Sequence, residues 1–144
     1  MKRICDLLDG KGHDIWFLPP DATVYEAVQH MADKSVGALL VMEDDELVGI
    51  VSERDYARKV ILRGRSSRET PVGEIMSYPV ICVSPDLTVE QTMALMTERR
   101  IRHLPVMVDD TVIGVISIGD VVRGIIEEKE FYIQQLTTYI TSGA

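Results

Sequence analysis

The residues with the clearest chemical potential are two copies of the pattern Ser-x-x-Asp, at Ser52 to Asp55 and at Ser117 to Asp120. Each copy follows an apolar run directly and stands where a helix is expected to begin. A hydroxyl and a carboxylate one helical turn apart form an acceptor pair for a vicinal diol, and ribose carries such a diol. The same pattern is also an ordinary capping box, in which serine and acid satisfy free backbone amides. The residues alone leave both interpretations open.

The other reactive side chains form no recognisable catalytic or metal-binding pattern. The three histidines lack the i, i+4 spacing of a helical zinc site, and the two cysteines have neither metal-ligand spacing nor a neighbouring histidine. Gly10-Lys11-Gly12 lacks the remainder of a P-loop and of a dinucleotide fingerprint. We therefore expect no catalytic residue, no metal, no catalytic cofactor and no enzymatic activity.

Both Ser-x-x-Asp patterns belong to a longer internal repeat. A constant shift of 65 residues places residues 15–61 on residues 80–126 without a gap, so that Pro20-Asp21 falls on Pro85-Asp86. The identities extend through turns and apolar positions alike. The sequence therefore predicts a tandem duplication.

Each repeat is expected to have the element order β-α-β-β-α. Capping boxes at Thr23 to Glu26 and at Thr88 to Gln91 predict the first helix of each repeat, which carries apolar residues at i, i+3, i+4 and i+7. Nearly continuous apolar runs predict buried strands, and acidic clusters predict hairpin turns. The expected strands are 15–18, 36–42 and 47–51 in the first repeat and 80–83, 101–108 and 112–116 in the second, with second helices starting at Ser52 and Ser117.

Two further segments lie outside the repeated pattern. The basic stretch Arg63 to Arg68 is expected to be a solvated connector, and Thr70-Pro71 predicts an N-cap and an N1 proline for a short helix through Met76. The last helix is expected to continue past its repeat with a seam spaced alternately by four and three residues. This seam consists of Val122, Ile126, Lys129, Ile133, Leu136 and Ile140. Either the N-terminal segment or a second copy in a dimer would cover it.

Composition limits the class of protein. The chain has 144 residues, 46% of them hydrophobic, a formal net charge of −8 and no apolar stretch long enough for a membrane span. The net charge makes nucleic acid a poor partner. We expect a globular protein of the cytoplasm, with neither a membrane nor a nucleic-acid partner.

Taken together, the duplicated segments Gly49 to Asp55 and Gly114 to Asp120, with Leu104-Pro105-Val106 on the preceding strand, resemble a pair of cystathionine-β-synthase (CBS) domains, the Bateman module. The resemblance covers nearly the whole chain. It implies a mixed α/β (α+β) fold in which two β-α-β-β-α repeats pack with pseudo-two-fold symmetry. It divides the module 1–144 into a first repeat with connector (1–65), a second repeat (66–126) and a C-terminal helix extension (127–144).

The resemblance also implies two clefts that hold adenosine derivatives such as AMP, ADP, ATP, NAD(H) or S-adenosylmethionine. Position by position, one cleft would use Ser117 and Asp120 on the ribose, and the other Ser52 and Asp55. The base would lie in an apolar slot. The residues expected around it are Ile15, Trp16, Val36, Gly37 and Ile116 in the first cleft, and Val51, Val80, Ile81 and Ile101 in the second.

Phosphate groups would meet Arg102 and His103, with help from Arg54 and Arg58. The first repeat has Gly37 and Ala38 in place of Arg102 and His103, so that the phosphate-binding charge is concentrated on one repeat. Leu40 also departs from the proline usual in the family, which Pro105 keeps. Trp16 has a second interpretation as a core residue.

These observations favour a stand-alone regulatory module that binds an adenine nucleotide and signals to a partner protein, as a homodimer. A structural or protein-interaction module with unoccupied clefts is the alternative. An enzyme that acts on a bound nucleotide is the weakest of the three hypotheses, since no nucleophile or metal site supports it.

Overall fold

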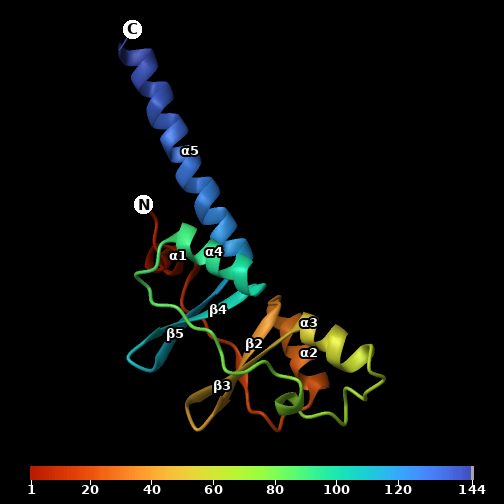
Figure 1. The fold of residues 1–144 in the computed structure, drawn as a ribbon. Coiled ribbons are helices and arrows are strands. Elements are labelled where there is room, and N and C mark those ends of the chain that lie inside the picture. Colours follow the sequence, from red (N-terminus) through yellow and green to blue (C-terminus); the bar gives the residue numbers. More distant parts are fainter. Residues whose placement is uncertain (144) are drawn as a thin grey trace. The chain divides into compact units, whose positions relative to one another are not determined.

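The computed structural model describes the chain from Met1 to Gly143, and its side chains from Met1 to Ile140. The chain divides into two compact units. Unit 2 is Ile15–Ile81, and unit 1 combines Met1–Asp14 with the chain from Cys82 onward. Each unit contains one β-β-α segment of the mixed α/β fold expected from the sequence, and a long C-terminal helix belongs to unit 1 (Figure 1).

Unit 2 is built on a three-stranded sheet with the order β1-β2-β3. The strand β1 pairs with β2 in parallel, and β2 pairs with β3 in an antiparallel hairpin. The helix between β1 and β2 buries Val24, Ala27 and Met31, which belong to one core with the strand residues Leu39 and Val41. The elements of this unit are β1 (Phe17–Leu18), α2 (Val24–Lys34), β2 (Ala38–Glu43), β3 (Glu46–Ser52), α3 (Glu53–Tyr56), the π-helix η1 (Ala57–Ile61) and the 3-10 helix η2 (Val72–Glu74).

Unit 1 repeats the helix, hairpin and second helix of unit 2. In its antiparallel hairpin the pairing register shifts between Val106 and Met107. The hairpin of unit 2 shifts at the equivalent place, between Val41 and Met42. Buried side chains include Val89, Met96, Leu104, Val106 and Ile116. The elements of this unit are α1 (Ile4–Lys11), α4 (Val89–Arg99), β4 (His103–Val108), β5 (Thr111–Ser117) and α5 (Ile118–Gly143).

The acidic clusters close the hairpins, as the sequence predicts. Asp44 and Asp45 have φ values of 50° and 64°, and Asp109 and Asp110 have φ values of 48° and 64°. Positive φ at both central residues is the requirement of a two-residue type I′ hairpin, and aspartate tolerates it better than most residues.

The helix starts also follow the sequence. The Thr88 hydroxyl accepts from Gln91 N at 3.1 Å while the Gln91 side chain accepts from Thr88 N at 3.0 Å, so that this capping box is confirmed. At Thr23 the structure shows the hydroxyl half, with Glu26 N donating at 3.1 Å.

Two expectations are wrong. The strand expected at 80–83 is a single parallel bridge between Val83 and Val106. In unit 2 the equivalent pairing uses a bond from Leu40 N to Trp16 O at 3.1 Å, and Pro105, at the position equivalent to Leu40, has no N–H to donate. Thr70 is not an N-cap, because its hydroxyl donates to Ser66 O at 2.6 Å within the preceding turn. Pro71 occupies the N-cap position of η2 instead of N1.

The helix α1 was not among the elements expected from the sequence. Ile4 N and Cys5 N donate to Leu87 O and Pro85 O at 2.9 Å each, so that the N-terminal helix belongs to the second repeat's unit. Ile4 and Leu8 are 0% and 1% exposed. The helix contacts both β5 and α5.

The helix α5 is 26 residues long, and its C-terminal part projects beyond the rest of unit 1 (Figure 1). Every residue from Glu130 to Ile140 is exposed. Among the described residues, no helix is both long and apolar enough to cross a membrane.

Candidate functional site

The second Ser-x-x-Asp motif forms a closed capping box at the junction of β5 and α5. Ser117 N donates to Asp120 Oδ2 at 2.8 Å, the Ser117 hydroxyl donates to the same oxygen at 3.0 Å, and Asp120 N donates back to Ser117 Oγ at 3.2 Å. These bonds satisfy amides that the helix itself leaves free. The motif therefore fixes its own geometry by local hydrogen bonds.

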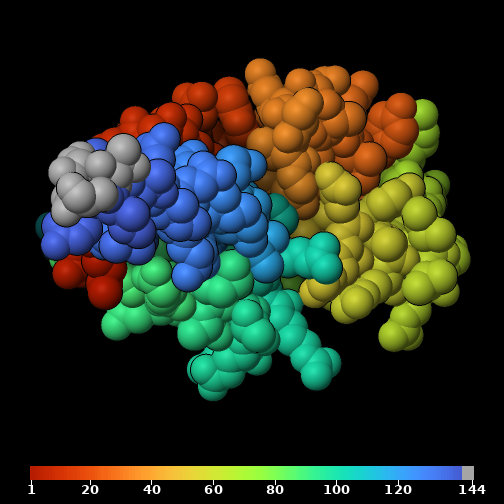
Figure 2. Space-filling model, turned by 90° about the horizontal axis from the view of Figure 1, so that it is seen from above, coloured from red at the N-terminus to blue at the C-terminus, as the bar shows by residue number. Residues whose placement is uncertain are grey.

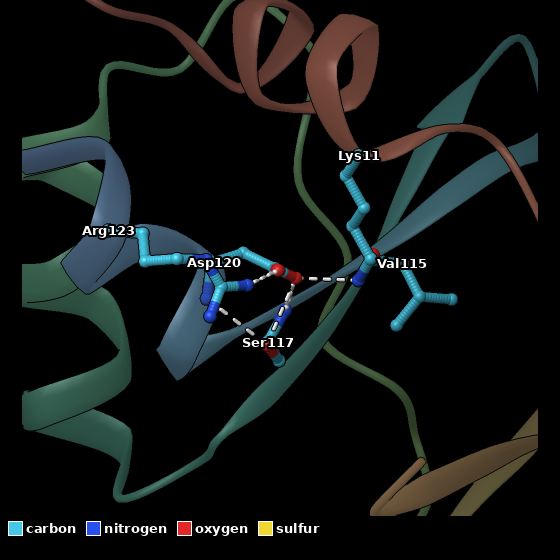
Figure 3. Close-up of polar contacts among 5 residues, drawn as sticks. All are labelled: Lys11, Val115, Ser117, Asp120 and Arg123. Atoms are coloured by element: carbon cyan, nitrogen blue, oxygen red, sulfur yellow. Dashed lines mark hydrogen bonds and ion pairs between the residues drawn. The ribbon is translucent and has the colours of Figure 1, made fainter. Parts of the chain in front are cut away.

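Two cations converge on the Asp120 carboxylate (Figure 3). Lys11 Nζ, which reaches down from α1, lies 2.5 Å from Oδ2 and also donates to Val115 O at 2.7 Å. Arg123 Nη2 lies 2.6 Å from Oδ1. Both carboxylate oxygens of Asp120 thus have charged partners within unit 1.

The electrostatics of Asp120 follow from these contacts. Burial by itself raises the pKa of this carboxyl, since the side chain is only 7% exposed. The hydrogen bond from Lys11, those from Ser117 and the Lys11 charge outweigh the burial, so that the pKa of Asp120 lies below its ordinary value of 3.8. Asp120 is therefore an anion at neutral pH.

The first motif has the same capping geometry. Ser52 N and the Ser52 hydroxyl donate to Asp55 Oδ2 at 2.9 and 3.1 Å, and Asp55 N donates to Ser52 Oγ at 3.2 Å. Lys59 Nζ lies 3.1 Å from Asp55 Oδ1, one helical turn later. The two motifs are thus equivalent in structure, but the second receives a lysine from a distant helix, α1.

The backbone brings Arg102 and Gly37 next to the two motifs. Ile118 N donates to Arg102 O at 2.8 Å, and at the equivalent place Glu53 N donates to Gly37 O at 3.0 Å. Each second helix therefore begins beside the residues that precede the hairpin. Arg102 itself is exposed.

His103 is less basic than the sequence suggests. Burial lowers the pKa of its ring, the Lys11 and Arg102 charges lower it further, and the Asp120 charge opposes them, so that the pKa lies below 6.5. At neutral pH the ring is neutral. It can donate a hydrogen bond to a phosphate but contributes no positive charge.

The apolar candidates fall into two groups by burial. Ile116 and Val51 are 0% and 1% exposed and belong to the cores of their units. Trp16 and Val36 are half-buried and pack against the core of unit 2, and Trp16 also has Lys34 Nζ 4.5 Å from its ring centroid. The remaining candidates around the base are half-buried; they are Ile15, Gly37, Val80, Ile81 and Ile101.

Each predicted cleft combines residues of both units. Ile116, Ser117 and Asp120 belong to unit 1, whereas Ile15 to Gly37, the other wall of that cleft, belong to unit 2. In the second cleft Ser52 and Asp55 belong to unit 2. The assembly of either cleft stays a prediction. Arg54 lies in α3, and Arg58 lies just after this helix. Both residues belong to unit 2, as Asp55 does.

The structure adds Lys11 to the candidate residues. In the sequence, Lys11 stands only within an incomplete P-loop pattern. The signal for its role lay in Ile4, Leu7 and Leu8, whose i, i+3, i+4 spacing predicts an amphipathic helix ending near Lys11. A pocket of about 290 Å³ opens between this helix and α5. Its lining includes Lys2, Lys11, Asp120, Arg123 and Glu127.

No group of three or more histidine, cysteine, aspartate or glutamate residues in the described part of the chain could hold a metal ion.

Two copies of a mixed α/β arrangement, each with a Ser-x-x-Asp motif where its hairpin ends, define the class of protein. Comparison with known proteins identifies the family. The CBS domain family matches residues 12–62 and 72–127, and this chain belongs to that family as a tandem CBS domain pair.

Individual relatives agree with the assignment. The mitochondrial CBS domain-containing protein CBSX3 of Arabidopsis thaliana is 45% identical over 97% of this chain and 72% of its own length. The crystal structure of the CBS domain protein NE2398 is 48% identical, covers 87% of this chain and 98% of that one, and superposes with a TM-score of 0.83. A structure of a protein with CBS domains from Burkholderia ambifaria is 46% identical over 88% and 95% of the two chains, with a TM-score of 0.85.

A more distant structure contains ligands. The CBS domain pair of protein MJ0100 was solved in complex with 5′-methylthioadenosine and S-adenosyl-L-methionine. It is 22% identical to this chain over 89% of this chain and 98% of its own, with a TM-score of 0.78, which shows a shared fold.

Proposed function

We propose that this chain is a regulatory module that binds an adenosine derivative in the clefts between its repeats and has no catalytic activity of its own, as is usual for CBS domain proteins. The observation that carries the proposal is the duplicated Ser-x-x-Asp motif, which has the same geometry at Ser52 to Asp55 and at Ser117 to Asp120. The complex of MJ0100 with two adenosine derivatives supports the ligand class. AMP, ADP, ATP, NAD(H) and S-adenosylmethionine all carry the required diol.

In this proposal Ser117 and Asp120 bind the ribose of one ligand. Asp120 Oδ1 is the oxygen more open to exchange, because its partner Arg123 is 67% exposed and an exposed ion pair contributes little. A ribose hydroxyl can replace that contact at small cost. Arg123 is then free to follow the ligand's phosphate.

In this cleft, Arg102 and His103 bind the phosphate groups of the ligand. A guanidinium grips phosphate oxygens in a bidentate manner, and the neutral His103 ring adds a hydrogen bond. The second cleft uses Ser52 and Asp55 with Arg54 and Arg58 nearby. Since Gly37 and Ala38 stand where the second repeat has Arg102 and His103, we expect the two clefts to differ in affinity for phosphate-bearing ligands.

The test is isothermal titration of the protein with AMP, ATP, NADH and S-adenosylmethionine, followed by Asp120→Asn and Asp55→Asn. Loss of a charged acceptor for the diol should weaken binding at the affected cleft by about tenfold or more, equivalent to about 1.4 kcal/mol. Asp110→Asn is the matched control, because it makes the same chemical change in an exposed hairpin turn whose positive φ suits asparagine. Mass spectrometry of a copurifying small molecule would identify the preferred ligand.

One observation favours the alternative, a structural or protein-interaction module with unoccupied clefts. Asp55 and Asp120 already bind serine and cations of the same chain, which a purely structural cap would also do. This alternative predicts no heat with any of the four ligands. It also predicts that Asp120→Asn changes stability without changing any affinity.

The proposal extends to assembly and location. We propose a homodimer that transmits ligand binding to a partner protein; the related CBS-CP12 protein of bloom-forming cyanobacteria, 32% identical, is described as hexameric. A ligand can switch such an assembly only if it binds one arrangement better than another. We also propose the cytoplasmic location that the sequence suggests. The related protein CBSX3 is described as mitochondrial, which argues against this location.

A further inference from the structure

The surface of α5 beyond the body of unit 1 is apolar and exposed along one stripe. Ile126, Ile133, Leu136 and Ile140 are 49%, 62%, 62% and 68% exposed. Tyr132 and Tyr139, which flank this stripe, are 52% and 76% exposed. We refer to these six residues as the α5 stripe.

Within unit 1, no described segment covers the α5 stripe. In unit 1, burial along α5 is confined to its beginning, where Asp120, Val121 and Gly124 are buried. Figure 2 shows the blue residues of α5 in the foreground of the molecule. An exposed apolar stripe of this length marks an interaction surface.

Charge distinguishes the possible occupants of the stripe. Residues 131–143 contain no charged side chain, although the whole chain has a net charge of −8. A charged peptide would gain no ion pair there. A membrane surface is also a poor occupant, since interfacial helices carry lysine and arginine, whereas Glu127, Glu128 and Glu130 precede this segment. A second copy of α5 buries the same neutral surface of residues 131–140 on both sides, and Lys129 is the one charged residue of the proposed seam.

We propose that α5 pairs with α5 of a second copy as an antiparallel two-helix coiled coil that begins near Ile126 and extends to the end of the helix, a length of about 27 Å at about 1.5 Å per residue. The spacing of four and three residues along the stripe is that of a coiled-coil seam. This inference rests on the homodimer in the proposed function and is independent of nucleotide binding.

Lys129 determines the orientation. It occupies a seam position between Ile126 and Ile133, and in a parallel pair it would face the partner's Lys129. In an antiparallel pair with Ile133 facing the partner's Leu136, Lys129 lies opposite the partner's Ile140. There its alkyl stem packs on an aliphatic side chain while the ammonium group reaches water.

Glu130 determines the register. In the pairing of Ile133 with the partner's Leu136, Glu130 lies near the partner's Thr137, and Tyr132 lies beside the partner's Tyr139. A shift that paired Lys129 with the partner's Ile133 would bring the two Glu130 carboxylates together. Like charges at that position repel, so the first register is favoured.

The first experiment measures mass. Light scattering after gel filtration should give twice the chain mass of 16.1 kDa for the wild type. The double variant Ile133→Glu, Leu136→Glu should be monomeric, whereas Gln134→Glu, Gln135→Glu, which adds the same charge outside the seam, should remain dimeric. A monomeric wild type would overturn both this inference and the homodimer. A dimer that survives the seam variant would overturn the α5 interface alone.

The second experiment measures orientation by disulfide cross-linking in a Cys5→Ala, Cys82→Ala background of verified stability. Lys129→Cys protein mixed with Ile140→Cys protein should form a cross-linked heterodimer. Ile126→Cys protein and Ile140→Cys protein should each fail to cross-link with themselves. Efficient self-linking at both of those positions would show a parallel pair and overturn the antiparallel arrangement. Titration with ATP and S-adenosylmethionine, done separately on the monomeric variant, tests nucleotide binding and leaves this result unaffected.

Discussion

Lys11, at the end of α1, donates a hydrogen bond of 2.5 Å from Nζ to Oδ2 of Asp120, in the first turn of α5. The contact joins the N-terminal helix to the second Ser-x-x-Asp motif across 109 residues of sequence. It gives the second motif an electrostatic environment that the first one lacks, because Lys59 reaches Asp55 from the same helical run.

Substituting Lys11 should cost stability. Lys11→Met keeps most of the alkyl stem but leaves the Asp120 carboxylate, 7% exposed, without its strongest hydrogen-bond partner. We expect the free energy of unfolding in urea to fall by about 1–3 kcal/mol, as for other buried charged groups that lose a partner. Lys2→Met is the matched control, because Lys2 pairs with the exposed Glu127 at 2.8 Å and its loss should change stability far less. Equal losses in the two variants would refute the role of burial.

The stability of the protein in acid should also depend on the ion pair between Lys11 and Asp120. The pKa of Asp120 is held below 3.8 in the folded state, so the unfolded chain takes up this proton first as the pH falls. The stabilisation is therefore complete above pH 3.8 and is lost as the pH falls through the folded-state pKa. In Asp120→Asn this contribution is absent. The difference in unfolding free energy between wild type and variant should shrink progressively on acidification; a difference independent of pH would contradict the ionic contribution.

His103 should make stability depend on pH in a higher range. Its pKa is lowered in the folded state by burial and by Lys11, so the unfolded chain binds the proton more readily. The contribution is present above pH 6.5 and is lost as the pH falls through the folded-state pKa. His103→Gln should flatten this part of the profile of unfolding free energy against pH. An NMR titration of the wild-type ring with a midpoint above 6.5 would show that the sign is wrong.

Packing of α1 on β5 can be tested at Gly114. A Cβ atom on Gly114 would lie 2.6 Å from Leu8 Cδ2, and Leu8 is 1% exposed. Gly114→Ala should therefore lower the free energy of unfolding by about 1–3 kcal/mol through overpacking. Gly10→Ala meets nothing within 4 Å and should be neutral or stabilising, since alanine favours the helix. A neutral Gly114→Ala in thermal or urea unfolding would mean that α1 does not pack as described.

Much of the fold could be predicted because it is encoded locally. Residues within a few positions of one another form the capping box at Thr88, the apolar strand runs and the Asp109-Asp110 turn. Because the chain is duplicated, the same pattern also occurs at two places in the sequence. Predictions failed where a competing group intervened. Thr70 bonds to Ser66 instead of capping, and Pro105, which lacks the N–H that Leu40 donates in the first repeat, limits the strand expected at 80–83 to one bridge.

The candidate site divides in the same way. The sequence by itself determined the serine and aspartate of each motif and their capping geometry, because residues three apart at a helix start meet through local hydrogen bonds. The tertiary structure alone decided that Lys11 reaches Asp120 and that His103 loses basicity, whereas the Arg123 contact has the i,i+3 spacing of neighbours on one helix. Lys11 arrives from a helix 109 residues away, and burial depends on the packing of the whole unit, so neither can be read from spacing along the chain.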